Sequence, residues 1–311
     1  MKSFIDRLIE KVKKKRSHVC VGLDPHLEQL PKHLMNKARE KVKGDNSRQV
    51  ALGLAIWWFN KTIIDNIYDI AVAVKPQVAF YEKVGSSGML ALKETVQYAR
   101  QKGLLVILDG KRNDIGSTAR AYAEAYLKGQ GLDNSIQADA ITVNPYLGVD
   151  GIKPFIENKE NGAFVLIKTS NPSSGDLQDL VLKDGNKLYQ KMGQYVSEWG
   201  QNSIGENGYS NLGAVVGATY PEELKILRYE MPHSYFLIPG FGVQGGSVLD
   251  VVNGFNDDGL GAIVNSSRGI IFAYRREPWS GRFVEKEFGL AARAAALDMK
   301  DKINSALGGR R

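Results

Sequence analysis

The sequence predicts an α/β protein built as one (β/α)8 TIM barrel, and three observations support this prediction. The chain has 311 residues, and such a barrel commonly occupies about 250 residues or more. About eight short apolar runs recur along the chain, and segments with helical spacing separate most of them. This alternation is typical of a parallel sheet, and about eight units close a barrel better than they fill an open sheet. We therefore expect residues 1–311 to form a single domain.

The expected strands are nearly continuous hydrophobic runs bounded by Gly, Pro, Asn or Asp. Such runs are typical of parallel strands that are buried on both faces. In chain order they lie at residues 19–23, 70–79, 104–108, 138–143, 163–168, 212–217, 235–239 and 260–264.

The expected helices carry apolar residues at helical spacing, with charged residues between them. An N-terminal helix at about 2–15 precedes the first strand. The later helices are predicted at residues 48–68, 87–102, 117–128, 187–200, 221–230 and 289–306. Two polar segments, 24–47 and 171–186, are predicted to be loops. Each directly follows a strand, so each should lie on the face of the barrel where active sites form.

The composition narrows the classes of partner. Hydrophobic residues make up 43% of the chain and charged residues 24%, and no apolar run approaches the ~18 residues that span a membrane. The formal net charge of +7 fits either a surface for nucleic acid or a pocket for an anionic small molecule. The basic residues are scattered, and their densest run, 11–16, lies on a helix that also has an apolar face. We therefore expect a small-molecule partner, with no nucleic acid and no membrane.

Location and metal content follow from a few residue types. Asp6 and Glu10 argue against a transit peptide, because such peptides are poor in acidic residues. The only cysteine, Cys20, is flanked by valines and is expected to be a buried strand residue rather than part of a disulfide. The four histidines form no close pair at metal-ligand spacing. These features predict a cytoplasmic protein without a metal site.

Polar residues gather where the predicted strands end, which is where barrel active sites are built. They are Asp24, Lys75, Gln77, Asp109, Asn144, Thr169, Ser170, Gln244 and Arg268. One such residue means little, but polar residues at the ends of most strands favour a functional site.

The sequence LDGKRNDIGST at 108–118 is the sharpest of these clusters. Asp109 and Lys111 are two residues apart on an extended chain, so their side chains point to the same face. Asp114 follows on the loop. A structural ion pair at a strand end is the alternative interpretation. The strand-end position, together with Lys75 from the preceding strand, favours a catalytic role.

A second cluster is the glycine-rich stretch PGFGVQGG at 239–246. It contains G-x-G-x-x-G, but Asn265 rather than an acid lies about 20 residues on, so it is a weak dinucleotide fingerprint. A loop whose backbone N–H groups hold a phosphate fits better. Arg268, after the next strand, would supply a guanidinium to the same phosphate.

Together these stretches resemble the orotidine 5′-monophosphate decarboxylase family, and most closely its longer bacterial-type (type 2) branch. The family motif D-x-K-x-x-D-I-G-x-T is present as Asp109, Lys111, Asp114, Ile115, Gly116 and Thr118. Further matching blocks are VGLDP at 21–25, KPQVAFYE at 75–82, IKTSNPSSG at 167–175, PGFGVQGG at 239–246 and SSRG at 266–269.

The resemblance implies a barrel of the ribulose-phosphate-binding type and a reaction without cofactor. Orotidine 5′-monophosphate would lose CO2 to give uridine 5′-monophosphate in pyrimidine biosynthesis. Lys111 would protonate C6 of the ring, within an alternating row of catalytic residues. The row comprises Lys75, Asp109, Lys111 and Asp114.

The resemblance also implies the substrate-binding residues and a homodimer. Asp24 and Thr118 would hold ribose hydroxyls, and Ser170 would contact the pyrimidine. Gln244, Gly245 and Arg268 would hold the phosphate, and Gln77 is a further binding candidate. Asp114 and Thr118 would enter the pocket of the neighbouring subunit, so the active sites would be shared.

Two other functions remain open from the sequence. The first is a magnesium-dependent sugar-phosphate decarboxylase or aldolase of the same superfamily, although Lys75 would repel the metal. The second is a non-catalytic protein that binds a nucleotide phosphate, although every reactive position is filled.

Overall fold

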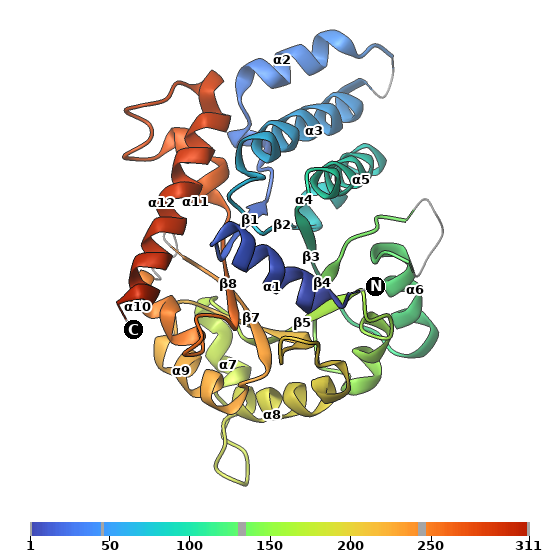
Figure 1. Ribbon diagram of the computed structural model, residues 1–311. Coiled ribbons are helices and arrows are strands. Elements are labelled where there is room, and N and C mark those ends of the chain that lie inside the picture. The colour runs from blue at the N-terminus through green and yellow to red at the C-terminus, as the bar shows by residue number, and fades with distance from the viewer. Residues whose placement is uncertain (1, 45–46, 130–134, 242–246, 310–311) are drawn as a thin grey trace.

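The computed structural model describes residues 2–44, 47–129, 135–241 and 247–309. Within these residues, eight parallel strands pair in chain order and β8 pairs with β1, so the barrel is closed (Figure 1). The strands are β1 (Val19–Leu23), β2 (Ala73–Pro76), β3 (Leu105–Arg112), β4 (Ala140–Val143), β5 (Gly162–Lys168), β6 (Ser210–Val216), β7 (Ser234–Pro239) and β8 (Ala262–Ser266). The predicted TIM barrel is confirmed.

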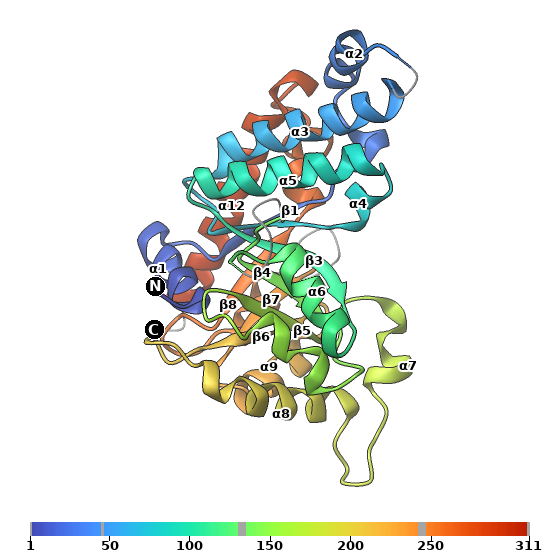
Figure 2. The ribbon, with the colours of Figure 1, turned by 90° about the vertical axis from the view of Figure 1, so that its right-hand side faces the viewer.

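Among the described residues, the long helices follow most of the strands and cover the outside of the barrel, except that the first precedes β1 and none follows β4 or β7 (Figures 1 and 2). They are α1 (Phe4–Lys15), α3 (Ser47–Ile67), α5 (Ser86–Gln101), α6 (Gly116–Tyr126), α8 (Leu188–Gly200), α9 (Pro221–Glu230) and α12 (Phe288–Gly308). The short helices include α4 (Ala79–Glu82), α10 (Val248–Val251) and α11 (Arg268–Ile271). No helix of the described residues is long and apolar enough to cross a membrane.

The prediction that 24–47 is a loop is wrong for its central part, which forms helix α2 (Lys32–Lys41). Only Leu34 and Ala38 of α2 are buried, so the apolar pattern is too sparse to indicate a helix. Helix α2 lies on the side of α3 that faces away from the strands, as Figure 2 shows. There the ammonium groups of Lys37 and Lys41 lie 5.0 and 5.7 Å from the ring of Trp58.

The second predicted loop, 171–186, is also partly helical. It contains a 3₁₀ turn at Pro172–Ser174 and the short helix α7 (Gly175–Gln178). Both follow β5, so this segment lies at the carboxyl ends of the strands, as expected.

Helix α1 closes the amino end of the barrel, and in Figure 1 it lies across the strands. Its apolar face joins the residues that fill the barrel interior, and the ring of Phe4 meets Phe164 of β5 edge-on at 6.1 Å. A Cβ at Gly162 would lie 2.1 Å from that Phe4 ring, so β5 must begin with glycine here. Lys13 and Lys14 are exposed on the other face of α1, as expected for a solvated helix face.

The barrel interior changes from apolar to polar along its axis. Near the amino end it is filled by side chains such as Ile107, Phe164 and Cys20, the last of which is fully buried in β1 as predicted. Toward the carboxyl end the apolar filling stops at Leu166 and Leu237, which form the floor of a cavity. The polar strand ends lie above that floor.

Candidate active site

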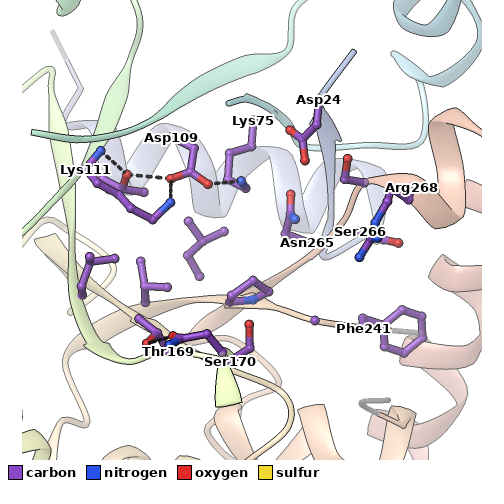
Figure 3. Close-up of a pocket in the computed structure, with 18 of the residues that line it drawn as sticks. Asp24, Lys75, Asp109, Lys111, Thr169, Ser170, Phe241, Asn265, Ser266 and Arg268 are labelled. Carbon is purple, nitrogen blue, oxygen red and sulfur yellow. Dashed lines mark hydrogen bonds and ion pairs between the residues drawn. The ribbon is translucent and has the colours of Figure 1, made fainter. Parts of the chain in front are cut away.

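A cavity of about 460 Å³ opens at the carboxyl ends of the strands, and every strand or the segment after it contributes to its wall. The lining includes Asp24, Lys75, Asp109, Lys111, Thr142, Leu166, Thr169, Ser170, Val215, Leu237, Phe241, Asn265, Ser266 and Arg268. Figure 3 shows Lys111, Asp109 and Lys75 along one wall, with Thr169 and Ser170 facing them and Arg268 at the far end.

The structure brings together six residues that the sequence predicts for the site. They are Asp24, Lys75, Asp109, Lys111, Ser170 and Arg268. Asp114 and Thr118 do not line this cavity, and neither does Gln77, which forms a backbone bridge to Asp109. The predicted phosphate-loop residues Gln244 and Gly245 lie outside the described residues.

The centre of the site is the carboxylate of Asp109, which accepts hydrogen bonds from two lysines. Lys75 Nζ donates to Oδ2, and Lys111 Nζ lies 2.5 Å from Oδ1. The side chain of Lys111 is 45% exposed, whereas those of Lys75 and Asp109 are 6% and 11% exposed. All three line the cavity, and Lys111 is the most exposed of them.

Lys75 and Asp109 hold each other in their charged forms. Burial alone raises the pKa of Asp109, but the attraction of Lys75 and Lys111 outweighs it and holds that pKa well below its usual range. Burial likewise lowers the pKa of Lys75, but the carboxylates of Asp109 and Asp24 raise it above its ordinary value. At neutral pH Lys75 and Asp109 therefore carry fixed charges, and fixed charges of this kind can stabilise charge that develops on a substrate.

The backbone of β3 is irregular where it carries these side chains. The pairing of β3 with β4 shifts register between Leu108 and Arg112, and Lys111 has a φ of 46°. A residue with a Cβ enters this left-handed region at a cost of roughly 1 kcal/mol or more. Backbone strain of this kind is often found at functional sites. Here it turns Lys111 toward the cavity.

Three polar atoms of cavity-lining residues are shielded from solvent and have no hydrogen-bond partner among the described residues. They are Asp24 Oδ1, Asn265 Oδ1 and Ser267 Oγ. Buried polar atoms are normally paired, since an unpaired one costs about 1–3 kcal/mol. A ligand with hydroxyl or N–H groups in this cavity would supply the missing partners.

The β5 loop forms the wall opposite the lysine row. Gln178 holds it in shape, because its Oε1 accepts from Thr169 N at 3.0 Å and its Nε2 donates to Thr169 Oγ1 at 2.8 Å. Beneath the loop, the fully buried Lys168 donates to Asp179 Oδ2 at 2.7 Å and lies 4.5 Å from the ring centre of Tyr220. The loop therefore presents Thr169 and Ser170 from a fixed base.

Several lining residues were not predicted from the sequence. Thr142 lies inside an apolar run that indicates only a strand, and Asn265 gave no signal beyond its place near a strand end. Thr142 could have been found from the inward-facing alternation of β4, since it follows Ala140, which lies in the barrel interior. In the described part of the chain, no three His, Cys, Asp or Glu side chains are placed to hold a metal ion.

The fold and the site define a (β/α)8 barrel of the enzyme type, with ammonium and carboxylate side chains lining a cavity at the carboxyl ends of the strands. The family model described as "Orotidine 5′-phosphate decarboxylase / HUMPS family" matches residues 17–278. The chain belongs to this family.

Individual relatives match over nearly their whole lengths. An orotidine 5′-phosphate decarboxylase from Rhodopirellula baltica is 47% identical over 307 residues, which cover 97% of this chain and 99% of the relative. One from Caldicellulosiruptor bescii is 42% identical, with 99% and 100% covered. The solved structure of Leishmania donovani OMP decarboxylase superposes with a TM-score of 0.76 at 33% identity, covering 98% of this chain and 99% of that one.

Proposed function

We propose that this enzyme decarboxylates orotidine 5′-monophosphate to uridine 5′-monophosphate and CO2, a step of pyrimidine biosynthesis, and that Lys111 donates the proton to C6. Its membership of the family and its full-length relatives named for this reaction support the activity. The observation that supports the role of Lys111 is its ammonium group, which reaches the cavity while Asp109 holds it at 2.5 Å.

The proposed chemical step needs only side chains of the protein. The bond between C6 and the carboxylate breaks, CO2 leaves, and the electron pair remains on C6. Lys111 Nζ is the nearest cation to that charge and gives C6 a proton, after which solvent restores the ammonium group. Asp109 aims Lys111, and Lys75 balances the charge of Asp109. No cofactor enters this scheme, because fixed charges meet the developing negative charge.

The proposed substrate orientation follows the length of the cavity. The pyrimidine would lie between the lysine row and Ser170, with the phosphate at Arg268 (Figure 3). The unpaired Oδ1 of Asp24 would accept from a ribose hydroxyl. Gln244 and Gly245 are proposed to complete the phosphate site. Gln77 lies outside the cavity lining, so we assign it no direct contact in this scheme.

We further propose a homodimer in which Asp114 and Thr118 enter the pocket of the partner subunit. Both lie outside the cavity of their own chain, and Thr118 is exposed. Exposed apolar side chains surround them, namely Ile115, Tyr146 and Leu147. The loop that carries the last two packs against the backbone of Asp114, because a Cβ at Gly151 would lie 2.9 Å from Asp114 O. Burial of this apolar surface would favour association.

We also propose that the chain is one folding domain in the cytoplasm. Helix α1 at the start of the chain fills the barrel interior, and α12 near its end packs on α3, so both belong to the same unit. The free, buried thiol of Cys20 supports a reducing compartment.

The proposed function is tested by mixing the purified protein with orotidine 5′-monophosphate and measuring CO2 release and nucleotide absorbance. Turnover that persists in excess chelator is the expected result. Turnover of a sugar phosphate that chelator abolishes and magnesium restores would support the aldolase-like alternative. Binding of uridine 5′-monophosphate without any turnover would support a non-catalytic nucleotide-binding protein.

A further inference from the structure

Thr142 of β4 links the two catalytic residues of β3. It is 2% exposed, and its side chain lines the cavity beside Asp109 and Lys111. Its hydroxyl accepts a hydrogen bond from the backbone N–H of Lys111 at 3.0 Å. The same hydroxyl donates to Asp109 Oδ1 at 3.0 Å. One oxygen atom therefore contacts both the backbone of the proposed proton donor and the carboxylate that aims it.

The direction of both hydrogen bonds is fixed by their chemistry. An amide N–H can only donate, and the ionised carboxylate of Asp109 can only accept. The single hydroxyl proton of Thr142 must therefore point at Asp109, while a lone pair faces Lys111. No rotation of the hydroxyl satisfies both groups in another way, so the pair of bonds has one orientation.

The bond to Lys111 N is made where the backbone is strained. With a φ of 46°, Lys111 turns its N–H away from the regular strand pairing and toward β4. A buried N–H without an acceptor costs about 1–3 kcal/mol, so the hydroxyl of Thr142 supports the left-handed conformation.

The hydrogen bond from the Thr142 hydroxyl to Asp109 acts on the side chain of Lys111 through the Asp109 carboxylate. Asp109 Oδ1 also receives Lys111 Nζ at 2.5 Å. The backbone of Lys111, the hydroxyl of Thr142, Oδ1 of Asp109 and Nζ of Lys111 thus form a closed ring of contacts. Such a ring fixes both ends of the lysine side chain.

We propose that Thr142 is a positioning residue that sets the place of Lys111 Nζ for proton transfer. This inference rests on the proposed decarboxylase function. Thr142 acts through the backbone of Lys111 and the carboxylate of Asp109, so its loss should slow the chemical step more than it weakens nucleotide binding. A displacement of about 1 Å in a reacting group can cost roughly 100-fold in rate.

The test replaces the hydroxyl while keeping the shape of the side chain. In Thr142→Val we expect kcat to fall by about 10- to 100-fold, while the Kd for uridine 5′-monophosphate changes by less than about threefold. Thr142→Ser restores the hydroxyl and should recover most of kcat. Thr142→Ala, which lacks the hydroxyl without adding a methyl group, should show a loss like that of Thr142→Val.

Ser210→Ala is the matched control. The hydroxyl of Ser210 is also buried at a strand, accepts from Leu212 N at 2.9 Å and donates to Gly200 O at 3.0 Å, but it lies at the amino end of the barrel. Its removal should lower stability and leave kcat unchanged. The control therefore separates the loss of a buried hydroxyl from the loss of this one.

Each outcome has a distinct meaning. If the native protein does not decarboxylate orotidine 5′-monophosphate, the proposed function fails. If it does, and Thr142→Val or the folded Thr142→Ala keeps kcat within about threefold, the inference about Thr142 is overturned. An equal loss in Thr142→Ser would also overturn it, because packing rather than the hydroxyl would then be responsible. A parallel loss of nucleotide binding would indicate a direct substrate contact instead.

Discussion

The side chain of Lys111 is the single group on which the proposed chemistry depends most. Its side chain is 45% exposed, whereas those of Lys75 and Asp109 are nearly buried, and its backbone is strained where it leaves β3. A lysine whose purpose is a structural ion pair gains nothing from that exposure. The geometry therefore favours the catalytic interpretation over the structural ion pair that the sequence left open.

Lys111→Ala should abolish turnover and leave the fold intact. The change removes both the proton donor and the cation nearest C6, so the loss should exceed the ~100- to 10,000-fold expected for a missing general acid alone. Calorimetry with uridine 5′-monophosphate should still detect binding, because ribose and phosphate contacts remain. Lys225→Ala, on the exposed surface of α9, is the control and should behave like the native protein. Substantial residual decarboxylation would contradict the proposed role.

Arg268→Ala should weaken both binding and catalysis. Arg268 lines the far end of the cavity, and no ion pair joins it to a carboxylate of the described residues. Loss of a charged hydrogen bond to phosphate costs roughly 2–3 kcal/mol, about 30- to 150-fold in affinity. Steady-state kinetics should show the loss, and added guanidinium ion should partly reverse it. Arg282 is an exposed arginine outside the cavity, so Arg282→Ala serves as the control. If kcat and KM are unchanged in Arg268→Ala, Arg268 does not bind the phosphate.

His18 should make the fold sensitive to mild acid. Burial lowers the pKa of His18 from its ordinary 6.5 to about 4. Since the unfolded chain takes up this proton near pH 6.5 and the folded chain only near pH 4, the free energy of unfolding should fall as the pH drops through that interval. The difference amounts to about 3 kcal/mol at most. Below about pH 4 this group should have no further effect.

Urea unfolding at pH 7 and pH 4.5 measures this dependence. The drop in unfolding free energy should be smaller in His18→Gln, which does not titrate, than in the native protein. The exposed His233 provides the matched variant, and His233→Gln should keep the native dependence. Equal drops in His18→Gln and the native protein would show that other groups are responsible.

At the residue scale, polar residues that end apolar runs predicted much of the site, although Gln77 and Asn144, chosen in the same way, do not line the cavity. Asp24, Lys75, Asp109 and Arg268 were found in this way. Thr142 was not predicted, because a β-branched residue inside ADAITV indicates only an ordinary strand residue. The left-handed φ of Lys111 depends on contacts with the neighbouring strand, which no local pattern encodes.

Among the elements, the β5 loop shows how a strand irregularity shapes one wall of the site. The pairing of β5 with β6 shifts between Leu166 and Lys168. Leu166 lines the cavity, whereas Lys168 is fully buried against Tyr220 and Tyr189. Such an irregularity re-aims side chains near an active site, and here Thr169 and Ser170 line the cavity. The ion pair with Asp179 then anchors the loop.

Asp179→Asn should be more destabilising than Lys168→Met. The first change leaves the fully buried ammonium group of Lys168 without its carboxylate, and an uncompensated buried charge is strongly destabilising. The second removes the charge itself and keeps the length of the side chain, so its cost should be small. Urea unfolding at pH 7 measures the free energy of unfolding of each variant and so shows which is less stable. A Lys168→Met protein less stable than Asp179→Asn would contradict this account of the loop anchor.

The long helices and the strands were predicted closely, because their apolar spacing is dense. Helix α2 was missed, since its stability comes from packing on α3 and from two lysines above Trp58 rather than from its own pattern. Strand β3 extends to Arg112, beyond the predicted end at 108. Residues 109–112 at the end of β3 include the charged side chains of the site, so a search for apolar runs could not show that they belong to the strand.

For the whole molecule, the open question is whether two subunits share each site. Asp114 and Thr118 lie outside the cavity of their own chain, while Lys75, Asp109 and Lys111 lie within it. The sequence could suggest this division only by resemblance, because an interface depends on a second chain.

Mixing Lys111→Ala with Asp114→Asn, each inactive as a homodimer, should restore activity after subunit exchange. In a mixed dimer one site combines Lys111 of one chain with Asp114 of the other, and the second site carries both lesions. Random exchange makes about half of the dimers mixed, so activity should reach roughly a quarter of the native value if the sites are independent.

Lys111→Ala mixed with Lys75→Ala is the control for complementation. Both residues belong to the cavity of their own chain, so every site in this mixture keeps a lesion and no recovery is expected. Exchange itself is followed by mass spectrometry of differently labelled subunits. If exchange occurs and the Asp114→Asn mixture stays inactive, Asp114 acts within its own chain.

The position of α1 at the closed end of the barrel has a consequence for biosynthesis. The backbone N–H of Ile5 donates to Asn211 Oδ1 across 206 positions of sequence, and Asn207 Nδ2 donates to Asp6 across 201. At a synthesis rate of about 5–20 residues per second, those partners emerge roughly 10–40 s after the helix does. During that interval the apolar face of α1 is without the surface that covers it in the finished protein. The apolar face of the first helix therefore stays uncovered for most of synthesis, and the barrel closes only late in translation.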